Sequence, residues 1–324
     1  MKGRSQNAER GRKKLLPAFI VLPSSFLSMQ LKGILPAIVT PFDAQDKFDA
    51  PAFERLLAYV YAEGVHGIYV CGQTGEGLQQ PNSQRKQVAE AAVKFSPPEK
   101  IVIIHIGAMN TADAVDLAQH AASIGAHAIS ALPPIGNYSF AEIKTYYSTI
   151  AAAAEIPFFI YYFPAFAAAI NKVEQILELC EIPNVHGLKF TDNDLFKMSE
   201  IKKSGATVFY GTDEMITAGL VMGADGGIGS FYNVMPGLFV KAYEHTIRNE
   251  WQAAQIIQKQ INEIIGIGLR YPVNAAVKAM LKRMGLDCGK CLAPRRWLTS
   301  DEEIELDQLL SVLPENPLNQ NYES

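Results

Sequence analysis

Short apolar runs recur along this chain at regular intervals, and amphipathic segments separate them. The runs are rich in Val, Ile, Phe and Tyr and are bounded by Gly or Pro, which is the pattern of buried strands. The pattern therefore predicts eight strands. They cover residues 34–42, 67–72, 101–107, 128–132, 157–162, 187–190, 207–210 and 226–230.

The segments between the strands carry apolar residues at helical spacing, as Phe53, Leu56, Leu57 and Val60 do. The predicted helices cover residues 52–63, 84–95, 112–124, 141–154, 172–180, 195–203 and 214–222. Asn82 and Thr111 are candidate N-caps of two of them.

Strand and helix alternate eight times, and the connections are short enough for parallel strands. This order favours a closed (β/α)8 TIM barrel over an open doubly wound sheet. No G-x-G-x-x-G motif follows the first strand, so the main signature of a dinucleotide-binding fold is missing.

The alternation stops after Ser230, and residues from about 237 to 313 read as several helices without a strand. We therefore predict a barrel over residues 29–235, C-terminal helices packed on it over 236–314, and a disordered tail over 315–324. Residues 1–28 begin with a basic run and a short apolar stretch, the outline of a secretory signal. Because Met29 directly precedes the first strand, we interpret them as a disordered extension or a mis-assigned start.

The charge balance and the number of cysteines narrow the classes of partner and the cellular compartment that we expect. From Met29 onward 23 basic residues face 32 acidic ones, and an acidic body argues against nucleic acid as a partner. No segment is apolar enough over sufficient length to predict a membrane span. Four cysteines in 324 residues do not indicate a disulfide framework, and Cys288-x-x-Cys291 lacks a second pair at zinc spacing. We expect free thiols in a reducing cytoplasm.

Barrel enzymes carry their chemistry at the C-terminal ends of the strands. Lys189 lies there on the sixth strand, where burial makes a charged amine costly and an uncharged amine can attack a carbonyl. The alternative is a lysine that reaches the surface or pairs with Asp192 or Asp194. Tyr161 ends the fifth strand on the same face as Phe159, so it can shuttle a proton beside a lysine or simply be a core aromatic.

Two other strand ends carry candidate binding groups. The glycine-rich segment 72–77 can expose backbone N–H groups, and Thr74 adds a hydroxyl, which suits a carboxylate. Asp213 and Glu214 follow the seventh strand and suit a polyhydroxylated substrate. An ordinary glycine-rich turn and first-turn acids of a helix are the alternatives. We expect no metal site, because no His stands near the two acids in the sequence.

Four of these motifs occur in the order found in the dihydrodipicolinate synthase / N-acetylneuraminate lyase family, which the chain resembles over roughly residues 31–298. Members of that family are pyruvate-dependent class I aldolases on a (β/α)8 barrel. The resemblance implies that Lys189 forms the Schiff base, that Tyr161 is the proton shuttle, and that Thr74 with its neighbouring amides holds the pyruvyl carboxylate. The motifs are Gly72-x-Thr74-Gly75-Glu76, Tyr161-x-x-Pro164, Gly187-Leu188-Lys189 and Gly223-Ala-Asp-Gly-Gly-Ile-Gly-Ser230.

Within the family the chain is similar to the N-acetylneuraminate lyase branch. Gly211, Asp213 and Glu214 stand where that branch binds the hydroxyl tail of the sugar. Thr191 and Ser230 stand where it places further sugar contacts. The synthase branch has an arginine shortly after the Tyr-x-x-Pro proline, to bind a second carboxylate. Here residues 165–168 are Ala-Phe-Ala-Ala, which disfavours that branch.

The chain also departs from the family pattern. Gln73, which we include among the substrate-binding residues, stands where relatives have a Ser or Thr that relays the proton of the tyrosine. Ala168 replaces a common glycine. The tyrosine that many members lend to a neighbouring subunit has no clear match, although Tyr138 is a candidate with a shifted loop.

The resemblance thus implies reversible aldol cleavage of N-acetylneuraminate, a sialic acid, to N-acetylmannosamine and pyruvate. It implies no metal or organic cofactor and a homotetramer. Two alternatives stay open. One is a sister enzyme with the same imine, such as a 2-keto-3-deoxy sugar acid aldolase or 4-hydroxy-tetrahydrodipicolinate synthase. The other is a non-catalytic barrel that binds a keto acid or a sugar.

Overall fold

The computed structural model describes residues 31–313 and Leu318. Its eight strands form one parallel sheet in the order β1-β8-β7-β6-β5-β4-β3-β2. The expectations for residues 1–28 lie outside the described residues, as do those for the tail 315–324 apart from Leu318. The strands are β1 (Gly33–Pro36), β2 (Gly67–Val70), β3 (Ile101–His105), β4 (Ala128–Ala131), β5 (Phe158–Tyr162), β6 (Val185–Phe190), β7 (Thr207–Tyr210) and β8 (Gly226–Gly229).

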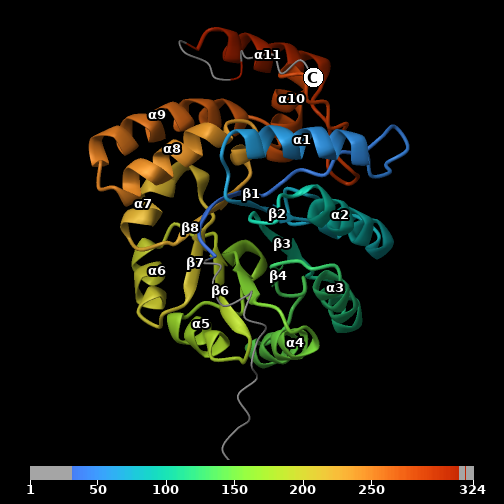
Figure 1. Cartoon of the computed structure of the whole chain (residues 1–324), viewed down its shortest axis with the longest axis vertical. Helices are drawn as coiled ribbons and strands as arrows, with labels where there is room; N and C mark the ends of the chain where they lie inside the picture. Colours follow the sequence, from blue (N-terminus) through green and yellow to red (C-terminus); the bar gives the residue numbers. More distant parts are fainter. Residues whose placement is uncertain (1–30, 314–317, 319–324) are drawn as a thin grey trace, which may run out of the picture. The chain divides into compact units, whose positions relative to one another are not determined.

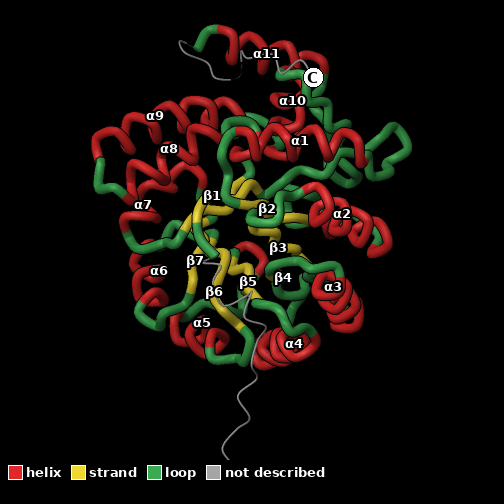
Figure 2. The backbone as a smooth tube through the Cα atoms, viewed as in Figure 1, coloured by secondary structure: helices red, strands yellow, loops and turns green. Residues whose placement is uncertain are grey.

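The sheet closes between its first and last members in this order. Ala37, just past β1, forms a parallel bridge with Tyr69 of β2, and the Ile38 N–H donates to the Tyr69 carbonyl over 2.9 Å. Figure 2 shows the strands as a central ring with helices around it. The prediction of a (β/α)8 barrel is confirmed.

Seven helices follow β1 to β7 in turn and cover the outside of the ring (Figure 1). Each one presents buried apolar residues toward the strands, as α1 does with Phe53, Leu56, Leu57 and Val60. The helices are α1 (Ala50–Ala62), α2 (Asn82–Phe95), α3 (Thr111–Ser123), α4 (Phe140–Ala153), α5 (Val173–Cys180), α6 (Leu195–Lys202) and α7 (Ile216–Val221).

Several predicted boundaries were wrong. The N-caps are Pro81 and Asn110 rather than Asn82 and Thr111, and the Asn110 side chain accepts the Asp113 N–H over 2.8 Å. The helix predicted to start at residue 214 begins at Ile216, because Asp213–Met215 forms a separate 3-10 turn. The strand predicted to reach residue 72 ends at Val70, because Cys71 adopts a left-handed backbone with φ of 57°.

Four helices follow β8, as predicted for this region, and no strand interrupts them over residues 236–311: α8 (Pro236–Ile247), α9 (Trp251–Gly268), α10 (Val273–Arg283) and α11 (Ser300–Ser311). In Figure 1, α8 and α9 lie side by side, and α10 lies near the α1 side of the barrel. Within the described ranges, no helix has both the length and the apolar run needed to cross a membrane.

Candidate active site

A cavity of about 750 Å³ opens at the C-terminal ends of the strands. All nine site residues predicted from the sequence line it, although they come from five different strand ends. They are Gln73, Thr74, Tyr161, Lys189, Thr191, Gly211, Asp213, Glu214 and Ser230. The structure thus brings together the whole predicted set, because parallel strands in a barrel deliver their C-terminal ends to one face.

Lys189 lies at the floor of this cavity and is 5% exposed. The register of β5 against β6 makes Tyr161 its direct neighbour, and Lys189 Nζ lies 3.9 Å from the centre of the Tyr161 ring. The alternative of an ion pair with Asp192 or Asp194 is wrong. Those two carboxylates instead bind Lys197, at 2.8 Å and 3.7 Å from its Nζ.

A buried layer of aromatic side chains supports these two residues. The Tyr69 ring lies 5.0 Å from Lys189 Nζ and meets the Tyr161 ring edge-on. Burial raises the pKa of Tyr69 well above its usual range, so its hydroxyl stays protonated and donates to Ser130 Oγ over 3.1 Å. Burial, helped by nearby positive charges, holds the pKa of His105 well below its usual range. His105 Nε2 accepts the Leu132 N–H over 3.1 Å, as only an uncharged ring nitrogen can.

The segment 72–77 lies at one side of the cavity and is held by groups distant in sequence. Thr74 Oγ1 lies 2.7 Å from Ser230 Oγ at the end of β8. Arg295 donates through Nη2 to Gln73 Oε1 over 3.0 Å, so this glutamine is engaged by a guanidinium. Asn274 of α10 donates to the carbonyls of Gln73 and Thr74 over 3.2 Å and 3.1 Å.

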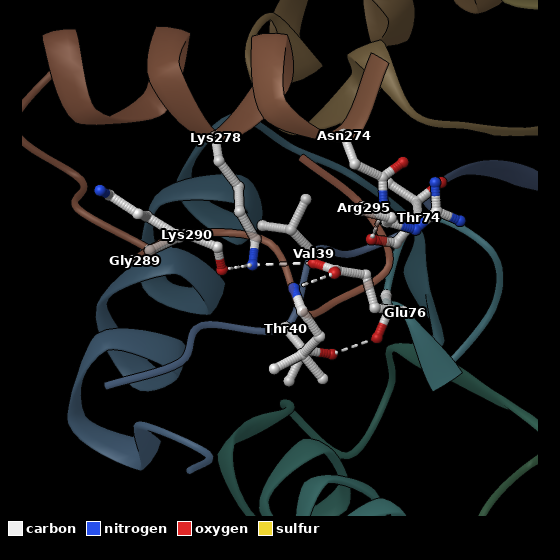
Figure 3. Close-up of polar contacts among 12 residues, drawn as sticks. Val39, Thr40, Thr74, Glu76, Asn274, Lys278, Gly289, Lys290 and Arg295 are labelled. Carbon is white, nitrogen blue, oxygen red and sulfur yellow. Dashed lines mark hydrogen bonds and ion pairs between the residues drawn. The ribbon is translucent and has the colours of Figure 1, made fainter. Parts of the chain in front are cut away.

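A fully buried ion pair between Glu76 and Lys278 of α10 anchors the same segment (Figure 3). Glu76 Oε1 lies 2.9 Å from Lys278 Nζ, and both side chains are 0% exposed. Glu76 Oε2 accepts the Leu292 N–H over 2.7 Å, and Lys278 also donates to the Lys290 carbonyl over 3.0 Å. These additional hydrogen bonds offset part of the cost of removing the two ions from water.

The part of the cavity that follows β7 is acidic. Asp213 is 6% exposed, and its Oδ2 accepts the Phe231 N–H over 2.8 Å. Burial, reinforced by the charge of Glu214, raises the pKa of Asp213 to about 7 despite that hydrogen bond. Asn262 of α9 holds the carbonyl of Glu214 over 3.1 Å. This carboxylate pair can accept hydrogen bonds from hydroxyl groups of a substrate.

The C-terminal residues of the site were missed by sequence reasoning. Asn274, Lys278 and Arg295 lie about 200 residues from the segment that they hold, and no motif connects them to it. The only sequence signal for Lys278 was its position: a lysine stands where the helical spacing of its apolar neighbours predicts a buried residue. In the part of the chain that the structure describes, no group of three or more His, Cys, Asp or Glu side chains is placed to hold a metal ion.

Comparisons with known proteins agree with this geometry. The family model of the dihydrodipicolinate synthetase family matches residues 30–313. The chain belongs to this family. It is therefore an enzyme of the class I aldolase type, a carbon–carbon lyase acting on a small molecule. Membership of this family of enzymes disfavours the alternative of a non-catalytic binding barrel.

Individual members of the family are similar to this protein over most of its length. An N-acetylneuraminate lyase of Rhizobium meliloti is 34% identical over 271 residues, which is 83% of this chain and 90% of the relative. The wild-type sialic acid aldolase of Ruminococcus gnavus is 32% identical with a TM-score of 0.81, covering 86% and 96% of the two chains. Dihydrodipicolinate synthase DapA-2 of Bacillus anthracis is 25% identical with a TM-score of 0.83, covering 88% and 99%. Both branches of the family thus share this fold.

Proposed function

We propose that the protein is an N-acetylneuraminate lyase, which cleaves N-acetylneuraminate reversibly to N-acetylmannosamine and pyruvate. The proposal rests on one cavity that brings these groups together. It holds the buried pair Lys189 and Tyr161 between two binding regions: the turn of residues 73–75, which we call the carboxylate cradle, and the acidic pair Asp213 and Glu214. Relatives named N-acetylneuraminate lyase at 33–34% identity support the same branch.

The proposed reaction uses these groups in order. The carboxylate of the open-chain keto acid binds Thr74 and the neighbouring N–H groups. The Lys189 amine attacks C2, and the resulting carbinolamine loses water to form a protonated imine. Tyr161 supplies the proton that leaves with this water and becomes a phenolate. The phenolate takes the proton of the C4 hydroxyl as the C3–C4 bond breaks, the imine accepts the electron pair of that bond, and the sugar aldehyde leaves. Tyr161 returns the proton to C3 of the enamine, and water hydrolyses the imine to release pyruvate, Lys189 and the proton that restores the Tyr161 hydroxyl.

The cavity wall after β5 supports the lyase branch over the synthase branch. Ala165 and Phe166 line the cavity in the stretch where the synthase branch has its arginine. Neither side chain can bind a second carboxylate, whereas Asp213 and Glu214 after β7 suit hydroxyl groups. The family resemblance also supports a homotetramer, and the thiol usage supports a cytoplasmic location. Both stay predictions.

The test is a pyruvate-release assay with N-acetylneuraminate and with 2-keto-3-deoxy sugar acids, run beside an assay for condensation of pyruvate with aspartate semialdehyde. We expect the highest kcat/KM for N-acetylneuraminate. Asp213→Ala and Glu214→Ala should each raise the KM for the sialic acid. If neither substitution changes its turnover, or if another substrate is preferred, the assignment to this branch is wrong.

A further inference from the structure

The backbone of the carboxylate cradle has an unusual hydrogen-bonding pattern. Three consecutive carbonyl groups, those of Gln73, Thr74 and Gly75, all accept hydrogen bonds from side chains of other segments. Asn274 holds the first two, and Gln80 Nε2 holds the third over 2.7 Å. Side chains outside residues 73–75 therefore hold this turn in one orientation.

The N–H groups of the same peptides are not used in this way. Between residues 31 and 313, the N–H groups of Thr74 and Gly75 donate to no other protein group, whereas the next N–H, that of Glu76, donates to the Gln73 carbonyl over 3.3 Å. Thr74 lines the cavity, and two adjacent free N–H groups in a turn can form an anion-binding concavity.

The planarity of the peptide bond connects the two observations. The Gln73–Thr74 and Thr74–Gly75 bonds are trans, so each carbonyl points opposite to the N–H of the same peptide. When Asn274 Nδ2 holds both carbonyls, the N–H groups of Thr74 and Gly75 are turned to the side away from α10. A rotation of either peptide would break a hydrogen bond to Asn274.

We infer that Asn274 is a positioning residue for the carboxylate of the keto acid: it fixes the two peptides whose N–H groups bind that carboxylate. This inference rests on the proposed function, because it assumes a 2-keto acid on Lys189. Asn274 is 7% exposed, and Figure 3 shows it extending from α10 toward Thr74 and Arg295. Arg295 reinforces the same orientation, since its Nη2 also lies 3.3 Å from the Gln73 carbonyl.

The role is distinct from general support of the fold. The buried pair Glu76–Lys278 anchors the end of the turn through a side chain, whereas Asn274 holds the peptide planes that carry the free donors. Loss of Asn274 should therefore weaken binding of a carboxylate selectively. A ligand with the same carbonyl and no charged carboxylate should respond much less.

The experiment measures borohydride trapping on Lys189 as a function of ligand concentration, with pyruvate and with methyl pyruvate. The variants are Asn274→Ala and Asn274→Asp, the second having nearly the same size but no donor. Loss of hydrogen bonds to a charged group predicts a rise of about ten- to a hundredfold in the half-saturating pyruvate concentration. The value for methyl pyruvate should change by about threefold or less, and the trapping rate at saturation should stay similar.

The matched control is Gln175→Ala, which removes the same kind of amide-to-carbonyl bond, from Gln175 Nε2 to the Ala169 carbonyl over 3.1 Å, among residues that do not line the cavity. It should leave the half-saturating pyruvate concentration near the wild-type value. Thermal unfolding of each variant checks that the fold is kept.

The outcomes separate the two proposals. If the wild type gives no pyruvate adduct, the proposed function fails. If the wild type is trapped but both Asn274 variants respond like the wild type, or respond equally to pyruvate and methyl pyruvate, the inference about Asn274 alone is overturned.

Discussion

The buried ion pair between Glu76 and Lys278 allows a quantitative test of how the C-terminal helices hold the active site. The perturbation is Lys278→Met, which keeps most of the volume of the side chain and removes its charge. Glu76 would then remain buried without its ion-pair partner, with its Oε2 bound by the Leu292 N–H. Glu76 belongs to the segment 72–77 that carries Thr74, so the substitution acts on the carboxylate cradle as well as on stability.

The size of the effect follows from the geometry. At 2.9 Å and an effective dielectric constant of about 20, the attraction within the pair is about 6 kcal/mol. The cost of removing each ion from water is several kcal/mol, so the intact pair contributes little net stability. When one partner is removed, the cost of burying the remaining ion is no longer offset by the attraction. We therefore expect Lys278→Met to lower the free energy of unfolding by about 3–5 kcal/mol.

The assay is urea unfolding followed by circular dichroism, with pyruvate trapping as the functional readout. The matched control is Lys144→Met, which breaks the Lys144–Glu178 pair at the surface, where the two side chains are 40% and 45% exposed. It should cost about 1 kcal/mol or less. The double variant Glu76→Gln/Lys278→Met should recover at least half of the loss. If Lys278→Met costs no more than Lys144→Met, the reasoning about the buried pair is refuted.

Two further predictions concern the acidic side of the cavity. Because burial raises the pKa of Asp213 from 3.8 to about 7, the folded state holds a proton that the unfolded chain releases, and stability falls as pH rises from about 4 to 7. The unfolding temperature of Asp213→Asn should therefore rise relative to that of the wild type as the pH increases across this range. A difference between the two unfolding temperatures that does not change with pH would contradict burial as the cause of the raised pKa. Gly229→Ala would place a methyl group against the Asp213 carboxylate and the Tyr232 ring, so sialic acid cleavage should fall more than about tenfold while pyruvate trapping persists. Equal loss of both activities would show general damage instead.

The strands and the barrel were predictable because their signal is local. Most strands are short β-branched or aromatic runs between breakers, and eight strands in alternation with helices leave few topologies. Helix starts were not predictable to the residue. Asn110 and Thr111 are both good N-cap types, and only the hydrogen bond to the Asp113 N–H decides between them.

The strand ends also explain which part of the site could be predicted. Lys189 and Tyr161 lie near the C-terminal ends of recognisable strands and Asp213 follows one, and a barrel brings such ends together without further information. Asn274 and Arg295 come from the C-terminal region, whose packing depends on side-chain contacts between segments about 200 residues apart. Such contacts have no periodic signature in one sequence, so these residues emerged only from the structure.

The measurement that tests the central claim most directly is borohydride trapping during turnover of N-acetylneuraminate, followed by peptide mapping. The account predicts a reduced pyruvyl adduct on Lys189 in the wild type. It predicts none in Lys189→Arg, because a guanidinium stays protonated and does not attack a carbonyl. Release of pyruvate without an adduct on Lys189, or with the adduct on another lysine, would contradict the account.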